Sequence, residues 1–504
     1  MLRDLRNGAR VVATARTLAR HGALFPLELL PVPSLAVRLA RRVANRRAPG
    51  RPGERLAQAL QELGPAFVKL GQSLAVRGDL LGDAIARDLS ELQDRLPPFP
   101  AAEARAVVEA ELERPVAELF LSFDGRPVAA ASIAQVHLAV TTEGEEVAVK
   151  VLRPGIEAAI ERDLDFLLWL AERAERLRPS LRQLRPVDTV RILAETTRRE
   201  MDLRLEAAAA AEFKANCAHD QGFRVPAVDW RRTARRVVTF ERVSGLPADE
   251  RDVLLAHGHD PDAILAQAAV VFFNQVFRDG FFHADMHPGN MLVDERGDIV
   301  ALDFGIMGRL DLATRRHLAE ILVGFLTRDF ARVADVFFRA GYVPPDQDPQ
   351  AFQQACRAIG EPILGLPLGE ISLGRVLGQL LTVAQRFEME QQPRLVLLQK
   401  TMAVSEGVGR ALNPKVNIWQ VAQPLVEAWI WDNLGPAARA RDAVAEGLGM
   451  LQRLPPLVSR LEHLASETEA QRPRLRRGRQ GRRSPAVALA AGLALGLALG
   501  LLLG

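Results

Sequence analysis

The sequence predicts an α+β protein with two lobes, and three observations support this fold class. Apolar residues recur at helical spacing through most of residues 64–125 and again after residue 311, so these regions are expected to be helical. Between residues 127 and 150 the apolar period changes to two, which indicates paired strands with a turn at residues 142–144. A chain of 504 residues with 48% hydrophobic content can bury one large or two moderate cores.

Five segments are expected from the changes in period and composition. In order, they are a helical N-terminal extension (1–125), a smaller lobe (126–244), a larger lobe with a helical C-terminal region (245–470), a basic linker (471–484) and a transmembrane anchor (485–504).

The net charge of +3 hides two strongly basic ends. Residues 1–51 hold eleven Arg against two acidic residues, and residues 471–484 hold seven Arg and no acid. Such ends suggest contact with an anionic surface, and we expect no nucleic-acid partner because aromatic side chains are not interleaved with the arginines. Cys217 and Cys356 are too few for a disulfide framework, which indicates a reducing compartment.

Lysine is scarce in this chain. Of 65 basic residues only five are Lys, namely Lys69, Lys150, Lys214, Lys400 and Lys415. Arg carries a planar, delocalised charge, whereas Lys carries a compact point charge on a flexible stem. In a chain that uses Arg almost everywhere, each Lys raises the question of why Arg would not serve.

Two amphipathic helices are expected near the N-terminus. Residues 1–16 place arginines between apolar residues and contain no uninterrupted apolar segment of a signal peptide. This helix would lie either on a membrane or on the protein's own body. Residues 64–81 predict the second helix, in which Lys69 and Gln72 flank Gly71 in an apolar stretch.

The second strand of the predicted hairpin ends in Val-Ala-Val-Lys at Lys150. This pattern is that of the kinase strand whose lysine contacts the α- and β-phosphates and pairs with a helix glutamate. A long helix expected from Asp188 to Asn216 supplies that glutamate. Glu195 and Glu206 share one face of it, so helical periodicity leaves both open as the partner of Lys150.

The most specific motif lies at residues 281–305. His-Ala-Asp ends at Asp285, Asn290 follows five residues later, and Asp-Phe-Gly begins at Asp303. In this phosphotransfer layout Asp285 would orient or deprotonate a hydroxyl or water. Asn290 and Asp303 would supply hard oxygen ligands for Mg²⁺ on the phosphates of ATP. A strand expected at 235–245 would end in a hinge, which would offer backbone groups near Glu241 and Val243 to adenine.

Two other features bear on the class of site. His283 and His287 could suggest a zinc pair, but Pro288 breaks any helix that would align their imidazoles. The Arg of H-R-D is replaced by Ala, and no A-P-E or long loop follows the Asp-Phe-Gly, which disfavours a protein kinase.

Over about residues 10–435 the chain resembles the UbiB family of atypical kinases, the aarF-domain kinases tied to ubiquinone biosynthesis. Residues 69–72 resemble its K-x-G-Q motif, residues 200–202 its E-x-D motif, and residues 206–208 its E-A motif. The last match favours Glu206 over Glu195 as the partner of Lys150. The family's alanine-rich loop is similar to Ala129, Ala130, Ala131, Ser132, Ile133, Ala134 and Gln135.

The resemblance implies an atypical protein-kinase-like two-lobed fold. The alanine-rich loop would lie over the nucleotide in place of a glycine loop and restrain ordinary protein phosphorylation. The K-x-G-Q helix, with Lys69 and Gln72, would fold across the site. There Lys69 would pair with Glu200 and Asp202 and block a protein-substrate groove.

The uncharged tail predicts a membrane anchor. Residues 486–504 would extend roughly 28 Å as a helix, which just spans a hydrocarbon core. The preceding arginines would keep the body on the cytoplasmic side of the inner membrane. A hairpin or a surface helix is the alternative. Glycines recur every four residues at Gly492, Gly496, Gly500 and Gly504, which suggests either a homodimer interface or a low-complexity composition.

The resemblance implies that the protein supports ubiquinone biosynthesis at a membrane. It would use ATP and Mg²⁺ either to hydrolyse ATP or to phosphorylate a small or lipid-like molecule, such as a ubiquinone precursor. Other ubiquinone-biosynthesis proteins would be partners. A nucleotide-gated scaffold or lipid-extracting factor with little turnover is the alternative, and a true protein kinase is the third candidate.

Overall fold

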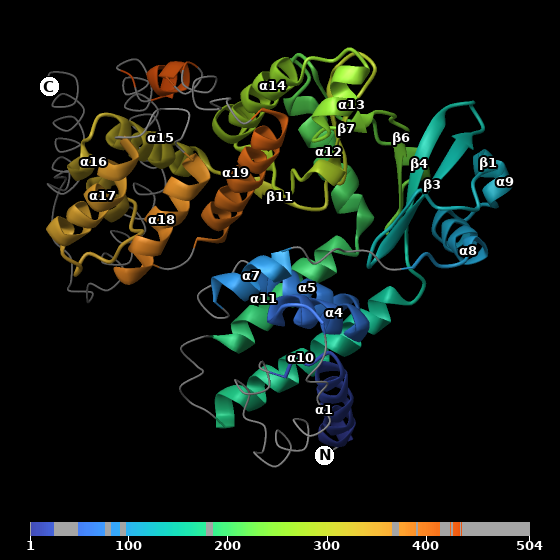
Figure 1. Ribbon diagram of the computed structural model, residues 1–504. Coiled ribbons are helices and arrows are strands. Elements are labelled where there is room, and N and C mark those ends of the chain that lie inside the picture. Colours follow the sequence, from blue (N-terminus) through green and yellow to red (C-terminus); the bar gives the residue numbers. More distant parts are fainter. Residues whose placement is uncertain are drawn as a thin grey trace, which may run out of the picture. The chain divides into compact units, whose positions relative to one another are not determined.

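The structure is a computed structural model of the chain. It describes residues 2–24, 49–75, 82–90, 97–177, 185–364, 372–389, 392–413 and parts of 424–435. Met1–Trp431 form one compact unit and Asp432–Gly504 a second, and every element below belongs to the first (Figure 1).

The first unit is mainly helical. Its helices are α1 (Leu2–Arg20), α4 (Pro52–Leu63), α5 (Pro65–Ala75), α7 (Asp83–Ser90), α8 (Ala101–Leu112), α9 (Val116–Leu119), α10 (Ile156–Leu177), α11 (Pro186–Glu200), α12 (Leu203–Asn216), α13 (Arg251–Ala256), α14 (Pro261–Phe273), α15 (Leu312–Leu326), α16 (Phe330–Arg339), α17 (Pro349–Leu364), α18 (Leu373–Arg386) and α19 (Pro393–Leu412). Short 3₁₀ or π turns are η2 (Trp230–Arg232), η3 (Asn274–Asp279) and η4 (Pro288–Asn290).

The strands in the described part of the chain form three small sheets. They are β1 (Phe120–Phe123), β2 (Ala129–Ala130), β3 (Ala134–Thr141), β4 (Glu146–Leu152), β5 (Phe223–Arg224), β6 (Val237–Glu241), β7 (Leu246–Pro247), β8 (Phe281–His283), β9 (Met291–Val293), β10 (Ile299–Ala301) and β11 (Met307–Arg309). The sheet orders are β1-β3-β4-β6 with β2 beside β3, then β5-β10-β9-β7, and β11-β8.

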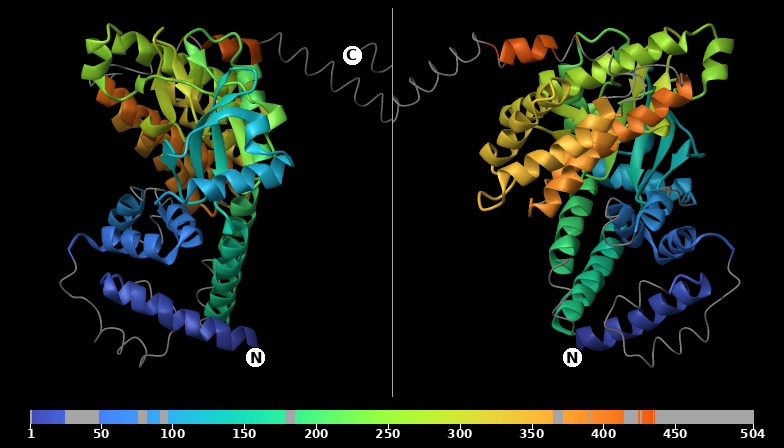
Figure 2. Two further views of the ribbon diagram at one scale, coloured as in Figure 1. Left: turned by 90° about the vertical axis from the view of Figure 1, so that its right-hand side faces the viewer. Right: turned by 60° about the vertical axis from the view of Figure 1, so that its left-hand side comes forward.

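The N-terminal helices pack on the protein's own body. Phe67 of α5 shares a hydrophobic core with Ile160 and Phe166 of α10, and Figure 2 shows α10 and α11 as two long helices beside each other. On α1, Asp4 accepts a hydrogen bond from Trp169 Nε1 at 3.0 Å. The first helix was expected to lie either on a membrane or on the protein's own body. The described contacts are those of a helix packed on the body.

The smaller lobe is built on the antiparallel sheet of β1, β3, β4 and β6, with α8 and α9 beside it in Figure 1. Val149 and Val151 of β4 are buried against Val107 of α8. Because side chains alternate along a strand, the residue between them points to the other face. The predicted hairpin is confirmed: β3 pairs with β4, and Gly144 in the turn adopts a φ of +90° that favours glycine.

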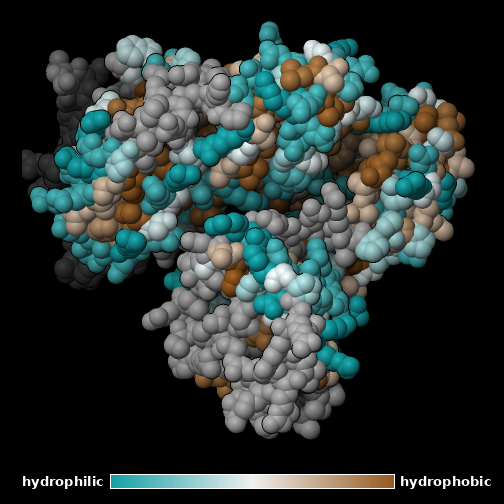
Figure 3. All heavy atoms as spheres, viewed as in Figure 1, coloured by the Kyte–Doolittle hydropathy of each residue, from teal (hydrophilic) through white to brown (hydrophobic). Residues whose placement is uncertain are grey.

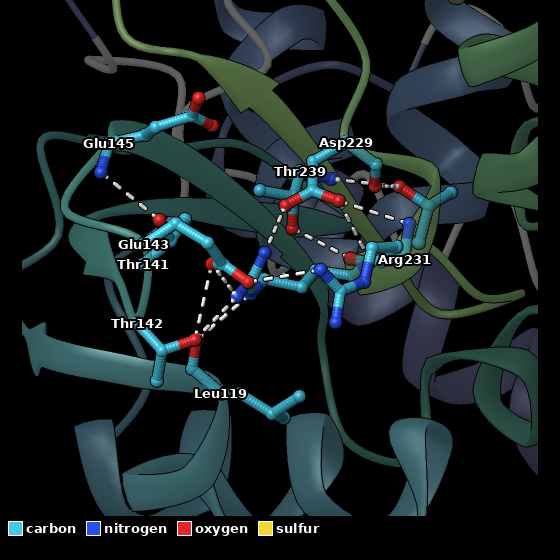
Figure 4. Close-up of polar contacts among 10 residues, drawn as sticks. Leu119, Thr141, Thr142, Glu143, Glu145, Asp229, Arg231 and Thr239 are labelled. Atoms are coloured by element: carbon cyan, nitrogen blue, oxygen red, sulfur yellow. Dashed lines mark hydrogen bonds and ion pairs between the residues drawn. The ribbon is translucent and has the colours of Figure 1, made fainter.

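A buried arginine ties three segments of this lobe together, and its partners Leu119, Thr142, Glu143 and Asp229 are labelled in Figure 4. Arg232 is 5% exposed. It donates hydrogen bonds to Asp229 at 2.7 Å, to the Leu119 carbonyl at 2.9 Å, to Thr142 at 2.9 Å and to Glu143. This network joins the end of α9, the β3–β4 turn and the segment before β6. It therefore fixes the strand that leads to the predicted hinge.

The larger lobe contains the two smaller sheets and the helices from α13 onward. Helices α15 to α19 surround a core that includes Phe330, Phe337, Phe352 and Cys356. Burial raises the pKa of Cys356, and likewise of Cys217, to about 12. Both thiols therefore act as small apolar side chains.

The single helix expected from Asp188 to Asn216 is wrong, because two helices occupy this region. Helix α11 ends at Glu200 and α12 begins at Leu203. Between them Asp202 leaves the helical conformation, with φ −111° and ψ 91°, and accepts a hydrogen bond from the Arg204 amide as an N-cap. The shared helical face expected for Glu195 and Glu206 therefore does not exist.

The predicted single-pass anchor at 485–504, and the inner-membrane localisation that depended on it, are contradicted. In the part of the chain that the structure describes, no helix is both long and apolar enough to cross a bilayer. The apolar α14 has only 13 residues, and the 22-residue α10 carries charges along its length. Residues 485–504, including the glycine stripe and the dimer expected from it, lie outside the described residues.

The surface of the first unit is mixed. Figure 3 shows polar residues over much of the face in view, with smaller apolar groups between them. Exposed apolar side chains occur on several elements, for example Leu121, Val128, Ile192 and Leu255. Scattered exposure of this kind is normal for a folded protein and does not by itself indicate a partner.

Candidate active site

Lys150 brings three distant segments together. It lies on β4 between the buried residues Val149 and Val151, so its side chain leaves the opposite face of the sheet. Its ammonium donates to both carboxylate oxygens of Glu206 on α12, at 2.8 and 2.9 Å. It also donates to Asp303 Oδ1 at 3.2 Å. One lysine and two carboxylates thus form a cluster between the strand, the helix and the Asp-Phe-Gly segment.

The geometry also distinguishes between the two glutamates that periodicity left open. Glu206 is nearly buried and holds Lys150. Glu195 is exposed on α11 and pairs with Arg199 of the same helix at 2.7 Å. The helix break before α12 separates the two residues, so a shared helical face no longer relates them.

Burial and charge oppose each other in this cluster. Burial raises the pKa of Glu206 to about 7, and the nearby ammonium offsets this only in part. The charge of Lys150 lowers the pKa of Asp303 to about 2. Burial also disfavours the ammonium, but Asp303 and Glu206 outweigh it and hold the pKa of Lys150 above its usual value. When both carboxylates are ionised they share one ammonium, so the cluster carries an excess negative charge.

The backbone of the Asp-Phe-Gly segment holds the carboxylate of Asp303 in position. Asp303 has a φ of 54°, in a left-handed region that few residues other than Gly, Asn and Asp adopt readily. Phe304 is buried, with its ring about 6.0 Å from those of Phe213 and Phe240. The Gly305 amide donates to Asp303 Oδ1 at 3.2 Å. These contacts hold a carboxylate that is itself 51% exposed and accessible to a cation.

Two histidines shape the neighbouring loop. His283 is fully buried, and its Nδ1 accepts from the Asp285 amide at 3.2 Å, so Nε2 carries the proton and donates to the Leu302 carbonyl at 3.0 Å. Burial lowers the pKa of His283, which favours this neutral form. His287 Nδ1 accepts from the Gly289 amide at 3.1 Å. These structural roles argue against the zinc pair.

Asn290 and Asp303 fit a magnesium ion by the chemistry of their atoms. Asn290 Nδ2 donates to the Asp285 carbonyl at 3.1 Å, which orients the amide and leaves Oδ1 as a hard oxygen ligand. The backbone of Leu302 donates to the Asn290 carbonyl at 2.8 Å, so the hairpin of β9 and β10 brings the two candidate ligands to its open end. Asp303 adds the excess negative charge described above.

An arginine holds the alanine-rich loop through hydrogen bonds to its backbone. The loop spans β2, a turn and the start of β3. Arg153 donates to the Ala131 carbonyl at 3.0 and 2.9 Å, and its amide donates to the Ile133 carbonyl at 2.8 Å. Ser132 is fully buried, and no residue of the described chain hydrogen-bonds to its hydroxyl. The turn is therefore fixed by its carbonyl groups rather than by its side chains.

Gln135, the last residue of that loop, points into the lobe. Its Oε1 accepts from the Phe99 amide at 3.0 Å, and Nε2 lies 3.2 Å from the Phe99 carbonyl and 2.7 Å from His137 Nε2. The side chain is 1% exposed. The structure thus places Gln135 where it anchors Phe99, whereas Ala129 is exposed and Ala130 is half-buried.

The predicted hinge follows β6. The Glu241 amide donates to the Ala227 carbonyl at 2.8 Å, and the Arg242 amide donates to the Glu146 carbonyl at 3.0 Å. Among the described residues, no backbone carbonyl accepts a hydrogen bond from the Val243 amide. Of the groups expected to face adenine, the amide of Val243 thus remains available.

The K-x-G-Q helix α5 meets α11 through an ion pair. Lys69 Nζ lies 2.9 Å from Glu200 Oε2, a distance typical of an ion pair although the angles fall short of a hydrogen bond. Both side chains are nearly buried, and Gln72 is half-buried on the same helix. Asp202 pairs with Arg204 at 2.7 Å and caps α12. The structure therefore brings Lys69 to Glu200 and gives Asp202 a capping role.

Lys400 was not among the expected site residues. It lies on α19, and its ammonium is 3.4 Å from Asp285 Oδ1. The two residues are 115 positions apart in the sequence, so no local sequence pattern joins them. The scarcity of lysine was the available signal: Lys69, Lys150 and Lys400 are three of the five lysines, and each pairs with a carboxylate in or near this site.

Comparisons with known proteins cover the segments that form this arrangement. The model of the ABC1 atypical kinase-like domain matches residues 91–337, which contain Lys150, Glu206, Asp285 and Asp303. The model of the UbiB helical domain matches residues 356–417, which include α19. The mixed, kinase-like fold expected from the sequence is therefore confirmed, apart from the transmembrane helix.

Individual relatives match this chain over most of its length. A protein named "Probable protein kinase UbiB" from Marinobacter nauticus is 43% identical over 389 residues, covering 76% of this chain and 71% of the relative. The protein of the same name from Azotobacter vinelandii is 41% identical over 452 residues, covering 88% and 82%. The solved structure of Rv3197 with erythromycin, from Mycobacterium tuberculosis, is 26% identical and covers 77% of this chain and 97% of that one. Its TM-score of 0.48 is too low to support a conclusion. From the identity and coverage of the two relatives, the chain belongs to the UbiB family of atypical kinases.

Proposed function

We propose that the protein binds ATP with Mg²⁺ and transfers the γ-phosphoryl group to water or to a small or lipid-like acceptor. The observation that carries this proposal is the cluster in which Lys150 joins Glu206 and Asp303. Phosphoryl transfer needs positioned charge more than covalent help from the protein, and this cluster supplies charge at a fixed geometry.

Each residue has one part in the proposed reaction. Lys150, held by Glu206, contacts the α- and β-phosphates, and the alanine-rich loop lies over them. Asn290 and Asp303 would hold Mg²⁺, which neutralises phosphate charge when it is bound. Asp285 orients the attacking hydroxyl or water and accepts its proton, while the backbone at Glu241 and Val243 receives adenine.

A small acceptor is favoured over a protein substrate. Helix α15 begins at Leu312, seven residues after Gly305, so the chain after Asp-Phe-Gly forms β11 and a helix rather than a long substrate platform. Ala284 also lacks the arginine that would pair with a phosphorylated activation loop. By analogy with relatives named for UbiB, we propose that the acceptor lies in ubiquinone biosynthesis.

A nucleotide-gated scaffold or lipid-extracting factor with little turnover is the second candidate. The ion pair of Lys69 and Glu200 supports it, because it holds the K-x-G-Q helix α5 against α11 with both side chains nearly buried. Such a contact would restrain access to the site, and ATP would then act mainly by binding.

Asp285→Asn tests the first proposal. We expect Mg²⁺-dependent ATP turnover to fall on the order of 10³-fold, as is typical when a proton acceptor is removed, with ATP binding retained. Glu295→Gln is the matched control, because Glu295 is an exposed carboxylate on the hairpin between Asn290 and Asp303. Turnover in Asp285→Asn equal to that of Glu295→Gln would contradict the assignment.

Complementation separates the two candidates in cells. A deletion strain would receive either the wild-type gene or the Asp285→Asn variant, and its ubiquinone precursors would be profiled. Restoration by wild type alone supports a catalytic function. Equal restoration by both genes would favour the scaffold, because the variant still binds ATP.

A further inference from the structure

Helix α19 delivers a lysine to the candidate catalytic aspartate. Lys400 Nζ lies 3.4 Å from Asp285 Oδ1, and His287 Nε2 lies 3.8 Å from Oδ2 of the same carboxylate. Lys400 belongs to the segment matched by the helical-domain model, outside the kinase-like match that contains Asp285. A residue of the helical domain thus contacts the centre of the phosphotransfer site.

The position of α19 is fixed by contacts on both sides of Lys400. Arg394 pairs with Asp311, the N-cap of α15, at 2.6 Å. Thr401 is 1% exposed, and its hydroxyl lies 3.1 Å from the Ala284 carbonyl and 2.9 Å from that of Leu397, so its proton can be donated to either. The backbone next to Lys400 therefore packs directly on the loop that carries Asp285.

The lysine itself is held loosely. Its distance of 3.4 Å to Asp285 exceeds that of a strong charged hydrogen bond, and its side chain is 43% exposed. Exposed pairs of this kind contribute little to folding. By contrast, Lys150 is nearly buried and donates to two carboxylates. Lys400 can therefore take up a further anionic group without losing a buried contact.

The reacting group must come within reach of this ammonium. A proton acceptor such as Asp285 lies roughly 3 Å from the attacking oxygen, and that oxygen lies roughly 3 to 3.5 Å from the phosphorus it attacks. A cation beside Asp285 is thus a few ångströms from the oxygens of the γ-phosphate.

We propose that Lys400 is a catalytic residue that contacts the γ-phosphate and stabilises negative charge on the transferring phosphoryl group. In this step the bond between the γ-phosphorus and the β–γ bridging oxygen breaks, with its electron pair going to ADP. A bond forms between the phosphorus and the attacking oxygen, whose proton moves to Asp285. As Asp285 is neutralised, the Lys400 charge loses its counter-ion and is available to the phosphoryl oxygens. The inference rests on the proposed phosphotransfer function.

The test compares four single variants of the full chain. Lys400→Met removes the charge and keeps an unbranched stem, and Lys400→Arg restores a charge. Thr401→Val removes the hydroxyl that contacts Ala284, and so reports on the docking of α19. Lys214→Met is the matched control, an exposed lysine on α12 with no assigned part in the site. ATP and ADP affinities and Mg²⁺-dependent ATP turnover are measured for each.

For Lys400→Met we expect turnover to fall on the order of 10²-fold, as for the loss of one preorganised charge donor. ATP affinity should fall towards that of ADP, while ADP affinity changes by less than about twofold, because only ATP has a γ-phosphate. Lys400→Arg should recover part of both losses. A residue that merely positioned Asp285 would lower turnover without changing the ratio of ATP to ADP affinity.

The outcomes distinguish the inference from the function on which it rests. Wild-type turnover and a wild-type affinity ratio in Lys400→Met, with Asp285→Asn inactive, would overturn the role of Lys400 alone. The same losses in Thr401→Val would overturn it too, because helix docking would then explain them. If the wild-type chain binds neither ATP nor ADP, the proposed function itself fails.

Discussion

Two lysine–carboxylate contacts belong to the candidate site, and they are built differently. The contact of Lys150 with Glu206 is short, doubly hydrogen-bonded and nearly buried, with side chains 16% and 7% exposed. The contact of Lys400 with Asp285 is long and open, with side chains 43% and 29% exposed. The first suits a group that must keep its position, and the second suits groups that exchange partners during a reaction.

The difference follows from where each lysine is placed. Lys150 lies in the middle of a sheet strand, and the second carboxylate, Asp303, is held by its own backbone conformation. Lys400 lies on α19, which packs on the loop of Asp285, and the Lys400 side chain itself is 43% exposed. Burial makes the first pair energetically costly to break, whereas solvent screens the second.

Removing Lys150 should have the largest effect on stability. In Lys150→Met the carboxylates of Glu206 and Asp303 lose their shared counter-ion, and breaking a buried pair in this way costs about 3 kcal/mol. Lys400→Met breaks an exposed contact and should cost about 0.5 kcal/mol. Urea unfolding of both variants measures the comparison. Equal losses would show that the two contacts do not differ as the geometry indicates.

The pH dependence of stability should isolate Glu206. Burial raises its pKa from an ordinary 4.5 to about 7 in the folded chain. Between these values the folded state binds more protons than the unfolded state, so the free energy of unfolding contributed by Glu206 falls as pH rises, and it is constant above about 7.

We therefore expect Glu206→Gln to gain stability relative to wild type as pH rises from about 5 to about 7. Burial lowers the pKa of His283, but this residue is present in both proteins and cancels in the difference. Asp303 stays ionised there, since its pKa is lowered to about 2. Glu195→Gln, an exposed glutamate, is the control. A pH-independent difference for Glu206→Gln would rule out the raised pKa.

Breaking the third lysine contact should have the smallest effect on the chemistry. Lys69→Ala removes the ion pair with Glu200 that holds α5 against α11. We expect autophosphorylation to rise, because by the proposed gating role the K-x-G-Q helix would then no longer restrain access to the site. Glu200→Gln breaks the same pair and should act in the same direction. If both variants autophosphorylate like wild type, Lys69 is a structural lysine and does not gate the site.

The sequence was informative wherever the chemistry lies in a short segment. The spacing of Asp285, Asn290 and Asp303 is local, and so is the alternation that points Lys150 away from the core of its lobe. Motif spacing therefore located most of the residues that the structure brings together. Their roles in binding and catalysis remain predictions.

Features that depend on packing between distant segments were missed. Nothing near Lys400 relates it to Asp285, because only the docking of α19 brings them together. The buried Arg232 is likewise one arginine among 60, and its network becomes visible only when α9 and the β3–β4 turn meet it. The break at Asp202 had a local signal in its capping aspartate, but the surrounding helical pattern outweighed it.

The central claim is that this cluster is a site for Mg²⁺ and ATP, and Asp303→Asn tests it most directly. The substitution removes the half-exposed carboxylate that would bind the metal while keeping its size. ATP at 100 times its Kd should stabilise the wild-type chain by about 2.7 kcal/mol, seen as a rise in melting temperature that requires Mg²⁺. Asp285→Asn is the control and should keep this rise. The account predicts that Asp303→Asn folds but loses the rise. A rise equal to that of wild type would contradict it.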